Sequence, residues 1–194
     1  MPIRMATVAD VPQILDIYAP YVQNTAISFE YAVPTPESFT ARFLGITAQF
    51  PWLVWEEKGR VLGYAYGSAP FERAAFGWCA EASIYLHPDI RGKGIGKALY
   101  RVLEEILTLQ GYCKVYSLVT SANEASVAFH QAVGYRLTAR MPDCGYKLGQ
   151  WHSLLWLEKD LLFRQNPEKF PVSCPSIVDF DRKFQEILDT LSLS

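Results

Sequence analysis

The sequence lacks the features that mark membrane, secreted and nucleic-acid-binding proteins. Its apolar runs fall short of the roughly 18 residues that a membrane span requires, and residues 1–10 lack the apolar core of a signal peptide. The 194 residues carry a formal net charge of −2 and contain no basic run, which argues against a nucleic-acid partner. From these absences we expect a soluble, cytoplasmic protein that binds neither nucleic acid nor a membrane.

Cysteine is also sparse and unpaired in its spacing. The four cysteines are Cys79, Cys113, Cys144 and Cys174, and no two of them have the C-x-x-C spacing of a zinc or redox motif. We therefore expect no metal site, and four reduced, mostly buried thiols.

What the chain does contain is enough apolar material for a packed core. Half of its residues are hydrophobic and 20% are charged, a composition typical of one folded domain at this length. Apolar periodicity, turn residues and helix caps predict the order β-α-α-β-β-β-α-β-α-β-β over residues 3–161. Because strands and helices mix around one sheet, we expect an α/β or α+β fold.

The C-terminal stretch differs from the rest of the chain. Residues 166–175 form a proline-containing linker, and Val178–Leu191 has the apolar spacing of a helix. We expect a domain over residues 1–161 and a helical extension over residues 162–194. The helix is expected to cover the chain's own core or a dimer partner, and a functional lid is the alternative.

The stretch Glu81–Tyr100 combines a strand, a glycine-rich turn and a helix start. Such a turn presents backbone N–H groups and the positive end of the helix dipole to a phosphate. The spacing fails the P-loop pattern, because Arg91 stands in place of its first glycine and Ala98 in place of its hydroxyl residue. It fails the dinucleotide pattern because Lys97 replaces the third glycine. The pattern that it fits is Arg-x-x-Gly-x-Gly.

This loop resembles the pyrophosphate loop of the GNAT superfamily of acetyl-CoA-dependent N-acetyltransferases. The resemblance covers about residues 3–161 and implies the GNAT fold, a mixed, mostly antiparallel twisted sheet flanked by helices. It also implies acetyl-CoA as cosubstrate, bound by the strand backbone and the loop. The positions that match these contacts are Ile84, Tyr85, Leu86, Arg91, Gly92, Lys93, Gly94, Ile95, Gly96 and Lys97.

A second run resembles the other cofactor motif of the superfamily, Asn-x-x-Ser followed by Tyr and Gly-Tyr. Asn123 and Ser126 open a predicted helix, and His130 stands where the superfamily carries its Tyr. The resemblance implies cofactor contacts from Asn123 and Ser126 and a place near the sulfur for His130. A histidine can protonate a thiolate near neutral pH. The alternative is a helix histidine satisfied by the backbone.

Glu81 is a carboxylate among apolar neighbours, in the run WCAEASIYL. Attack of an amine on a thioester needs a base that removes a proton from the ammonium group. Partial burial among apolar side chains would raise the pKa of the Glu81 carboxyl toward the range of such a base. The alternative is an exposed strand residue that pairs with a lysine.

Together, the motifs resemble the phosphinothricin and methionine sulfoximine acetyltransferase family. The marks are PWLV, the W-x-A-E element, the run 126–135 and the element Gly-x-Trp-His at 149–152. The resemblance implies that Glu81 is the general base, that His130 is the catalytic histidine, and that the protein is a homodimer.

The same resemblance implies an amino-acid substrate held by four residues, Phe29, Phe71, Arg73 and Phe76. Arg73 matches an arginine that binds the substrate carboxylate, a task that suits its planar fork. Some herbicide-resistance members carry Lys in place of Phe71 and Tyr in place of Phe76. Without that cation and that hydroxyl, we expect a more apolar pocket that is less suited to phosphinothricin.

The predicted function is acetyl-CoA-dependent N-acetylation of a small amino acid or analogue, similar to phosphinothricin or methionine sulfoximine, by direct attack on the thioester. One alternative is another amine, such as a polyamine or a peptide N-terminus. The other is an acyl-CoA-binding sensor without turnover. A pure sensor needs neither Glu81 nor His130, which favours the enzyme.

Overall fold

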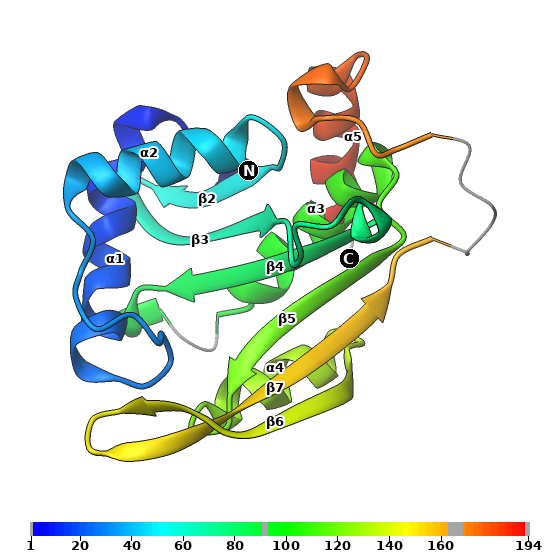
Figure 1. Ribbon diagram of the computed structural model, residues 1–194. Coiled ribbons are helices and arrows are strands. Elements are labelled where there is room, and N and C mark those ends of the chain that lie inside the picture. The colour runs from blue at the N-terminus through cyan, green and yellow to red at the C-terminus, as the bar shows by residue number, and fades with distance from the viewer. Residues whose placement is uncertain (1, 91–92, 163–168, 193–194) are drawn as a thin grey trace.

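The computed structural model describes residues 2–90, 93–162 and 169–192 (Figure 1). Within these residues one sheet of seven strands has the order β1-β2-β3-β4-β5-β7-β6. Neighbouring strands are antiparallel except β4 and β5, which are parallel. The predicted mixed, mostly antiparallel sheet is therefore confirmed. In chain order the elements are β1 (Ile3–Met5), η1 (Val8–Asp10), α1 (Val11–Asn24), α2 (Pro36–Thr47), β2 (Trp52–Glu57), β3 (Arg60–Ser68), η2 (Ala74–Phe76), β4 (Cys79–Leu86), η3 (Pro88–Ile90), α3 (Ile95–Gln110), β5 (Lys114–Thr120), α4 (Glu124–Ala132), β6 (Arg136–Lys147), β7 (Gln150–Asp160), η4 (Cys174–Ser176) and α5 (Phe180–Ser192).

Each face of the sheet has its own apolar core. On one face, α1 and α2 pack over β2 and β3 around Trp52 and Tyr64, each 1% exposed. On the other face, α3 buries Leu99, Leu103 and Ile106 completely. These three residues recur at helical spacing, so the apolar stripe that the sequence predicts is the face that α3 turns to the sheet.

β4 runs through the middle of the sheet and contributes to both cores. Ala80 and Ala82 lie in the core beneath α3, whereas Tyr85 packs against the core beneath α1 and α2. Successive strand residues point to opposite faces, so Glu81 shares the face of Tyr85. The candidate base therefore lies on the α1–α2 side of the sheet.

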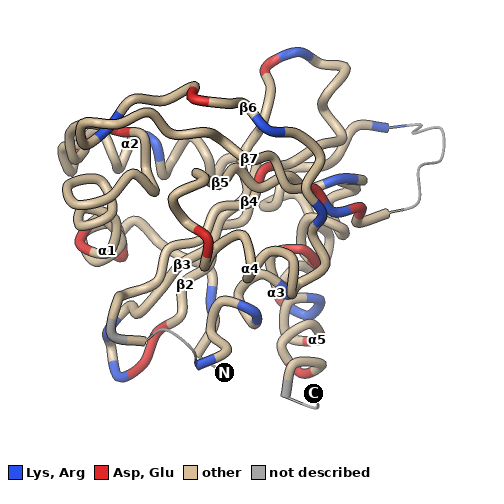
Figure 2. Tube along the Cα trace, turned by 90° about the horizontal axis from the view of Figure 1, so that it is seen from below, with Lys and Arg blue, Asp and Glu red and all other residues tan. Residues whose placement is uncertain are grey.

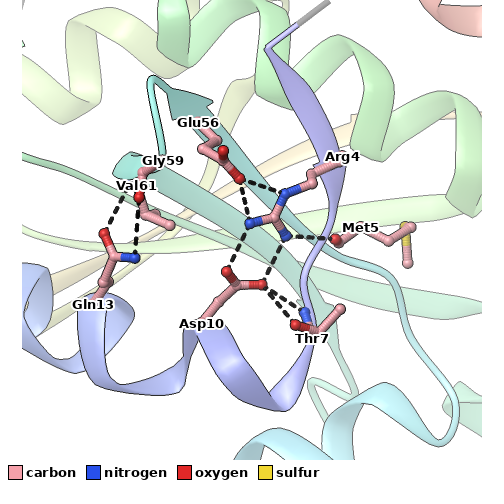
Figure 3. A network of polar contacts seen from close by, with 8 residues as sticks. All are labelled: Arg4, Met5, Thr7, Asp10, Gln13, Glu56, Gly59 and Val61. Carbon is pink, nitrogen blue, oxygen red and sulfur yellow. Dashed lines mark hydrogen bonds and ion pairs between the residues drawn. The ribbon is translucent and has the colours of Figure 1, made fainter.

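A partly buried ion pair fixes β1 to the sheet (Figure 3). The guanidinium of Arg4 donates to both carboxylate oxygens of Asp10 at 2.7 Å, and its Nε donates to Glu56 at 2.7 Å. Asp10 is 5% exposed, and its hydrogen bonds to Arg4 lower the pKa of its carboxyl. The N–H of Thr7 donates to the same carboxylate at 2.8 Å. Arg4 and Asp10 thus join β1, β2 and the start of η1.

The predicted C-terminal helix exists and covers the chain's own core. Residues 169–178 lead back to the core, where the N–H of Val172 donates to Gln110 O at 2.9 Å and the N–H of Cys174 donates to Gln49 O at 2.8 Å. α5 then packs against α3. The apolar side that the sequence predicts faces the core through Phe180, Phe184, Ile187 and Leu191.

β6 is longer than predicted. The alternation of the sequence predicts a strand over Tyr135–Met141 that ends before Pro142, but β6 continues to Lys147. It is an edge strand, and its pairing with β7 shifts register between Met141 and Gly145. Because edge strands tolerate proline and bulges, Pro142 interrupts the ladder without ending the strand.

The expectation of mostly buried thiols was wrong. None of the four cysteines forms a disulfide, but only Cys174 is buried, and Cys79 and Cys113 are half-buried. Cys144 is exposed because it lies on the edge strand β6.

Within residues 2–90, 93–162 and 169–192, no helix has both the length and the apolar character to cross a bilayer. No group of His, Cys, Asp and Glu side chains in those ranges could hold a metal ion. Figure 2 shows Lys and Arg residues lying beside Asp and Glu residues over the surface of this part of the chain.

Candidate active site

β4 and β5 diverge in the middle of the sheet (Figure 1). A cleft lies where the two strands separate. In the described chain, the two strands pair only between Cys79–Glu81 and Lys114–Tyr116. Beyond these residues the cleft brings together predicted site residues from β4 and from the start of α4. Its lining is formed by Ile27, Ala82, Ser83, Ile84, Tyr85, Tyr100, Ser117, Leu118, Val119, Thr120, Asn123, Ser126 and His130.

The backbone of β4 offers hydrogen-bonding groups to this cleft. The N–H of His87 donates to Leu62 O at 2.8 Å, on the β3 side. Because backbone groups alternate along a strand, the N–H groups of Ile84 and Leu86 point away from β3, and Ile84 lines the cleft. Tyr85 also lines the cleft, but its N–H and C=O face β3. Of the three predicted strand contacts, Ile84 and Leu86 therefore have the backbone geometry to bind a ligand.

The first turn of α3 lies beside β4. A Cβ added to Gly96 would lie 3.4 Å from Ile84 Cδ1 and 3.3 Å from Phe129 Cε2, so this turn packs closely on β4 and α4. Gly94 precedes the helix with a φ of +78°, a conformation that glycine adopts without steric cost. The N–H of Ala98 donates to Gly94 O at 3.1 Å. The N–H groups of the helical residues before it have no acceptor within the helix and can bind a phosphate.

The other residues predicted for the loop differ in their exposure to solvent. Lys93 and Lys97 are exposed, so both can contribute positive charge to this turn. Ile95 is 3% exposed, and only its backbone can serve a ligand. Arg91 and Gly92 lie outside the described residues.

Asn123 caps α4 at the cleft. Its side-chain oxygen accepts from the N–H of Ser126 at 3.3 Å. The amide NH₂ group of Asn123 is therefore its remaining donor. Both residues line the cleft, as the cofactor motif predicts.

His130 is 2% exposed, with partners at both ring nitrogens. Its Nδ1 lies 2.7 Å from Ser126 O, and because a carbonyl only accepts, Nδ1 carries the proton. Nε2 then accepts from Tyr100 Oη at 2.9 Å. Burial lowers the pKa of His130, so the imidazole is neutral and linked to a phenol.

Tyr100 is a site residue that sequence analysis missed. Its hydroxyl lies 3.2 Å from Ser117 Oγ and 3.2 Å from Ala82 O, and Ser117 donates to Ala82 O at 3.0 Å. Burial holds the pKa of Tyr100 far above its usual range. In the sequence, Tyr100 looks like one more core residue of α3. The available signal was a hydroxyl within an apolar stripe, because a buried tyrosine hydroxyl needs a partner.

Glu81 is the last residue of β4 that pairs with β5. It therefore stands at the apex of the cleft, the point where the two strands separate, next to Ala82, which lines the cleft. The residue is half-buried, and burial raises the pKa of its carboxyl from 4.5 to about 7. The rise in pKa that the apolar neighbours predicted is confirmed in direction. The alternative interpretation, in which Glu81 is an exposed strand residue, does not apply because the residue is half-buried.

Four aromatic side chains gather beside Glu81, and we call them the aromatic cluster: Phe71, Phe76, Tyr116 and Trp156. Tyr116 is the register partner of Glu81 on β5. Phe71 lies parallel to Trp156, with an interplanar angle of 8° and 5.4 Å between centroids, and 4.4 Å from Phe76. The Tyr116 ring stands edge-on to Trp156 at 5.7 Å. Sequence analysis predicted Phe71 and Phe76 but missed Tyr116 and Trp156, which looked like ordinary strand residues.

Phe29 lies at a different point of the same sheet face. Its ring fills the space over Gly145, where an added Cβ would come within 2.5 Å, and lies 6.4 Å from His152. His152 and Trp156 are four residues apart on one face of β7, a separation of about 13 Å. Phe29 and the aromatic cluster therefore stand at two ends of a stretch of β7.

A buried lysine anchors the segment that carries Phe29. Lys147 is 4% exposed, and its Nζ donates to Val22 O at 2.7 Å and to Ser28 O at 2.6 Å. Burial lowers the pKa of Lys147. Tyr31 also donates to Tyr146 O, so the early loop is tied to β6.

Arg73 lies in the exposed loop between Phe71 and Phe76, where it precedes η2. Its side chain is exposed. Arg73 is thus close in sequence to Phe71 and Phe76 of the aromatic cluster. Its guanidinium is accessible to an anionic ligand.

Known proteins resemble the chain over most of its length. A family model described as an acetyltransferase (GNAT) domain matches residues 3–156. An L-amino acid N-acyltransferase of Escherichia coli is 36% identical over 170 residues, which cover 87% of this chain and 98% of that protein. An L-methionine sulfoximine/L-methionine sulfone acetyltransferase of Pseudomonas paraeruginosa is 37% identical, with 82% of this chain and 94% of that protein covered. The solved structure of a phosphinothricin acetyltransferase from Sinorhizobium meliloti in complex with AcCoA has a TM-score of 0.81 at 33% identity, and the match covers 93% of this chain and 97% of that one.

Proposed function

Because this chain belongs to the GNAT family of acetyltransferases, we propose that it transfers the acetyl group of acetyl-CoA to the amine of a small amino acid or amino-acid analogue. By their names, the relatives act on L-amino acids, methionine sulfoximine and phosphinothricin. The observation that carries the proposal in this chain is Glu81, a carboxyl with a pKa of about 7 at the apex of the cleft.

Glu81 accepts the proton that the attacking ammonium group must lose. At pH 7 about half of the Glu81 carboxyls are ionised, and a base with a pKa near the working pH combines an available acceptor with a useful driving force. Its position next to the cleft lets the neutral amine approach a thioester held there. A binding protein without turnover has no need for such a group, which argues against the sensor alternative.

The residues of the cleft fit acetyl-CoA. The turn at Gly94 leaves open space where a Cβ would stand, and Lys93 and Lys97 flank the free N–H groups at the start of α3. These groups suit a pyrophosphate. The N–H of Ile84 and the amide of Asn123 face the part of the cleft that would receive the pantetheine arm. When bound there, acetyl-CoA supplies the thioester.

The N–H of Leu86 is proposed to donate to the thioester oxygen as negative charge develops on it. By strand alternation it points away from β3, on the side where β4 separates from β5, and Tyr21 donates to Leu86 O at 2.6 Å, which fixes the strand end. A preorganised donor of this kind stabilises the oxygen without rearrangement at the moment of attack.

His130 is proposed to assist the leaving thiolate through Tyr100. Both ring nitrogens of His130 have partners, whereas the Tyr100 hydroxyl lines the cleft and can turn toward a sulfur. His130 then acts as a positioning residue, and Tyr100 is the group that donates to the thiolate. This refines the direct role that the sequence assigned to His130.

The acceptor is proposed to lie on the α1–α2 side of the sheet, next to Glu81. Arg73 is the proposed partner of the substrate carboxylate because its guanidinium is exposed and planar. The rings of Phe71 and Phe76 border one end of this region. Phe29 borders the other end, near His152.

We also propose that the protein is a cytoplasmic homodimer with a domain over residues 1–161 and an extension over residues 162–194. The four cysteines form no disulfide, which supports a reducing compartment, and the family match that ends at 156 supports the boundary. Exposed apolar side chains on the edge hairpin support an interface between copies. These side chains are Leu137, Met141, Tyr146, Leu148 and Trp151. Light scattering during gel filtration tests the assembly, since a monomer mass would contradict it.

Release of CoA thiol from acetyl-CoA, measured with a panel of amines, tests the proposed function. The panel includes L-amino acids, methionine sulfoximine, methionine sulfone, phosphinothricin, spermidine and a short peptide. Turnover with an amino acid or analogue is the expected result. Turnover with spermidine or the peptide alone, or no turnover although calorimetry shows that acetyl-CoA binds, would contradict it.

A further inference from the structure

The aromatic cluster (Phe71, Phe76, Tyr116 and Trp156) indicates which amino acids the site accepts. We propose that the acceptor carries an aromatic or large apolar side chain, which packs on this cluster while its amine lies at Glu81. The inference rests on the proposed function and adds the substrate class.

Distance is the first argument. Tyr116 is the register partner of Glu81 on the neighbouring strand, and neighbouring strands are about 4.8 Å apart. Both side chains stand on the same face of the sheet. The amine and the side chain of one amino acid can therefore reach Glu81 and Tyr116 together.

Exposure is the second argument. Phe71 and Phe76 are 37% and 41% exposed although they contact each other. Phe71 already covers one face of Trp156, so the cluster is an ordered apolar surface. Covering its outer faces with an apolar side chain removes this area from water, which is favourable.

Charge is the third argument: the carboxylates that β7 carries near the cluster are already paired, so they are poor partners for the distal ammonium of a polyamine. The acidic residues on the same strand faces, Glu158 and Asp160, are both within 3.0 Å of Lys114 Nζ. Arg136 contacts the same two carboxylates at 2.6 Å and 3.1 Å. A second cation on the acceptor would therefore meet carboxylates that already have two partners.

The test compares kcat/KM for L-phenylalanine, L-tryptophan and L-methionine with values for methionine sulfone, phosphinothricin and spermidine, in the full-length protein. The first group should exceed the second by about tenfold or more. In Phe71→Lys, the ratio between L-phenylalanine and phosphinothricin should fall about tenfold, because a cation replaces an apolar ring. An effect of the new charge on Glu81 would change kcat/KM for both substrates equally, so it cancels in this ratio.

Val178→Lys is the matched control, since it adds the same charge at a site that is 74% exposed and outside the cluster. It should leave the ratio unchanged. Calorimetry measures the binding of N-acetyl-L-phenylalanine to the complex of the enzyme with CoA, which is a readout independent of turnover. This binding should be weaker in Phe71→Lys than in the wild type.

A preference for phosphinothricin or methionine sulfone, or a ratio that Phe71→Lys does not change, would overturn the inference and leave the proposed function intact. The same holds if the cluster is the surface that a second copy covers, which would appear as a dimer that Phe71→Lys dissociates without changing the ratio. Failure of every amino acid and analogue would instead overturn the proposed function.

Discussion

The two halves of the site are built from different parts of the chain. The proposed cofactor half uses mainly backbone groups of one continuous stretch, the N–H groups of β4 and of the first turn of α3, to which α4 adds the side chain of Asn123. The acceptor half uses side chains of three separate segments, the loop 70–77, β5 and β7. A site built from backbone groups depends on glycine positions and strand geometry, and both can be recognised in a sequence motif. A side-chain site depends on which distant residues the fold brings together.

The first prediction concerns Glu81, which lies where the two halves meet. Glu81→Gln should lower kcat about 1000-fold, since it removes the base and keeps the shape. The dissociation constant of acetyl-CoA, measured by calorimetry, should not change. Glu105→Gln, at an exposed position of α3, is the control and should retain full activity. Retention of kcat in Glu81→Gln would refute the base assignment.

The second prediction separates the halves through the backbone. Gly94→Val should raise the KM for acetyl-CoA about tenfold, because a β-branched residue is strained at a φ of +78° and the turn must move, at a cost of about 1–2 kcal/mol. The KM for the amine should stay the same. In Gly45→Ala, where an added Cβ meets nothing within 4 Å, both constants should be unchanged. An equal rise of both KM values in Gly94→Val would show that the halves are not independent.

The third prediction tests the link between Tyr100 and His130. Tyr100→Phe removes the hydroxyl proposed to face the sulfur, so kcat should fall about tenfold, equivalent to one lost hydrogen bond, with both KM values unchanged. Tyr112→Phe also removes a buried hydroxyl, which is 3.1 Å from Gln49 Nε2, but outside the cleft. It should leave kcat unchanged. If the two variants behaved alike, the effect at Tyr100 would be structural.

The smallest effect on activity is expected from the ion pair of Arg4. Arg4→Met should lower the free energy of unfolding by about 2 kcal/mol, because it leaves the buried carboxylate of Asp10 without its main partner. Both KM values should remain unchanged. Urea unfolding measures the free energy, and steady-state kinetics measure the KM values.

The pH dependence of this loss has a definite sign. The folded-state pKa of Asp10 is lowered, so its contribution is present above the unfolded-state value of about 4 and is lost as the pH falls through the folded-state value. The difference in the free energy of unfolding between the wild type and Arg4→Met should therefore become smaller at acidic pH. A difference that grows below pH 4 would contradict the role of Asp10.

The fold could be predicted from the sequence where local pattern and tertiary packing agree. The stripe of α3 and the helix cap at Asn123 are local features, and both are confirmed. The end of β6 could not be predicted, because Pro142 looks like a strand breaker. It is tolerated only because β6 is an edge strand, and edge position is a property of the assembled sheet.

The candidate site divides in the same way. Motifs identified Glu81, the turn at Gly94 and the start of α4, and the structure brings β4, beginning at the residue after Glu81, and the start of α4 to one cleft. Tyr116 and Trp156 could not be recognised, because their link to Phe71 crosses three segments. Tyr100 resembled a core residue since its helical spacing is that of its buried neighbours.

A titration of the Glu81 carboxyl by carbon-detected NMR tests the central claim most directly. The signal is assigned by its absence from Glu81→Gln, and its chemical shift is followed from pH 3 to pH 9. The account predicts a midpoint of about 7, because burial at the apex of the cleft disfavours the charged form. A midpoint near the ordinary value of 4.5 would show that the carboxyl is well hydrated, and it would contradict the base assignment on which the mechanism depends.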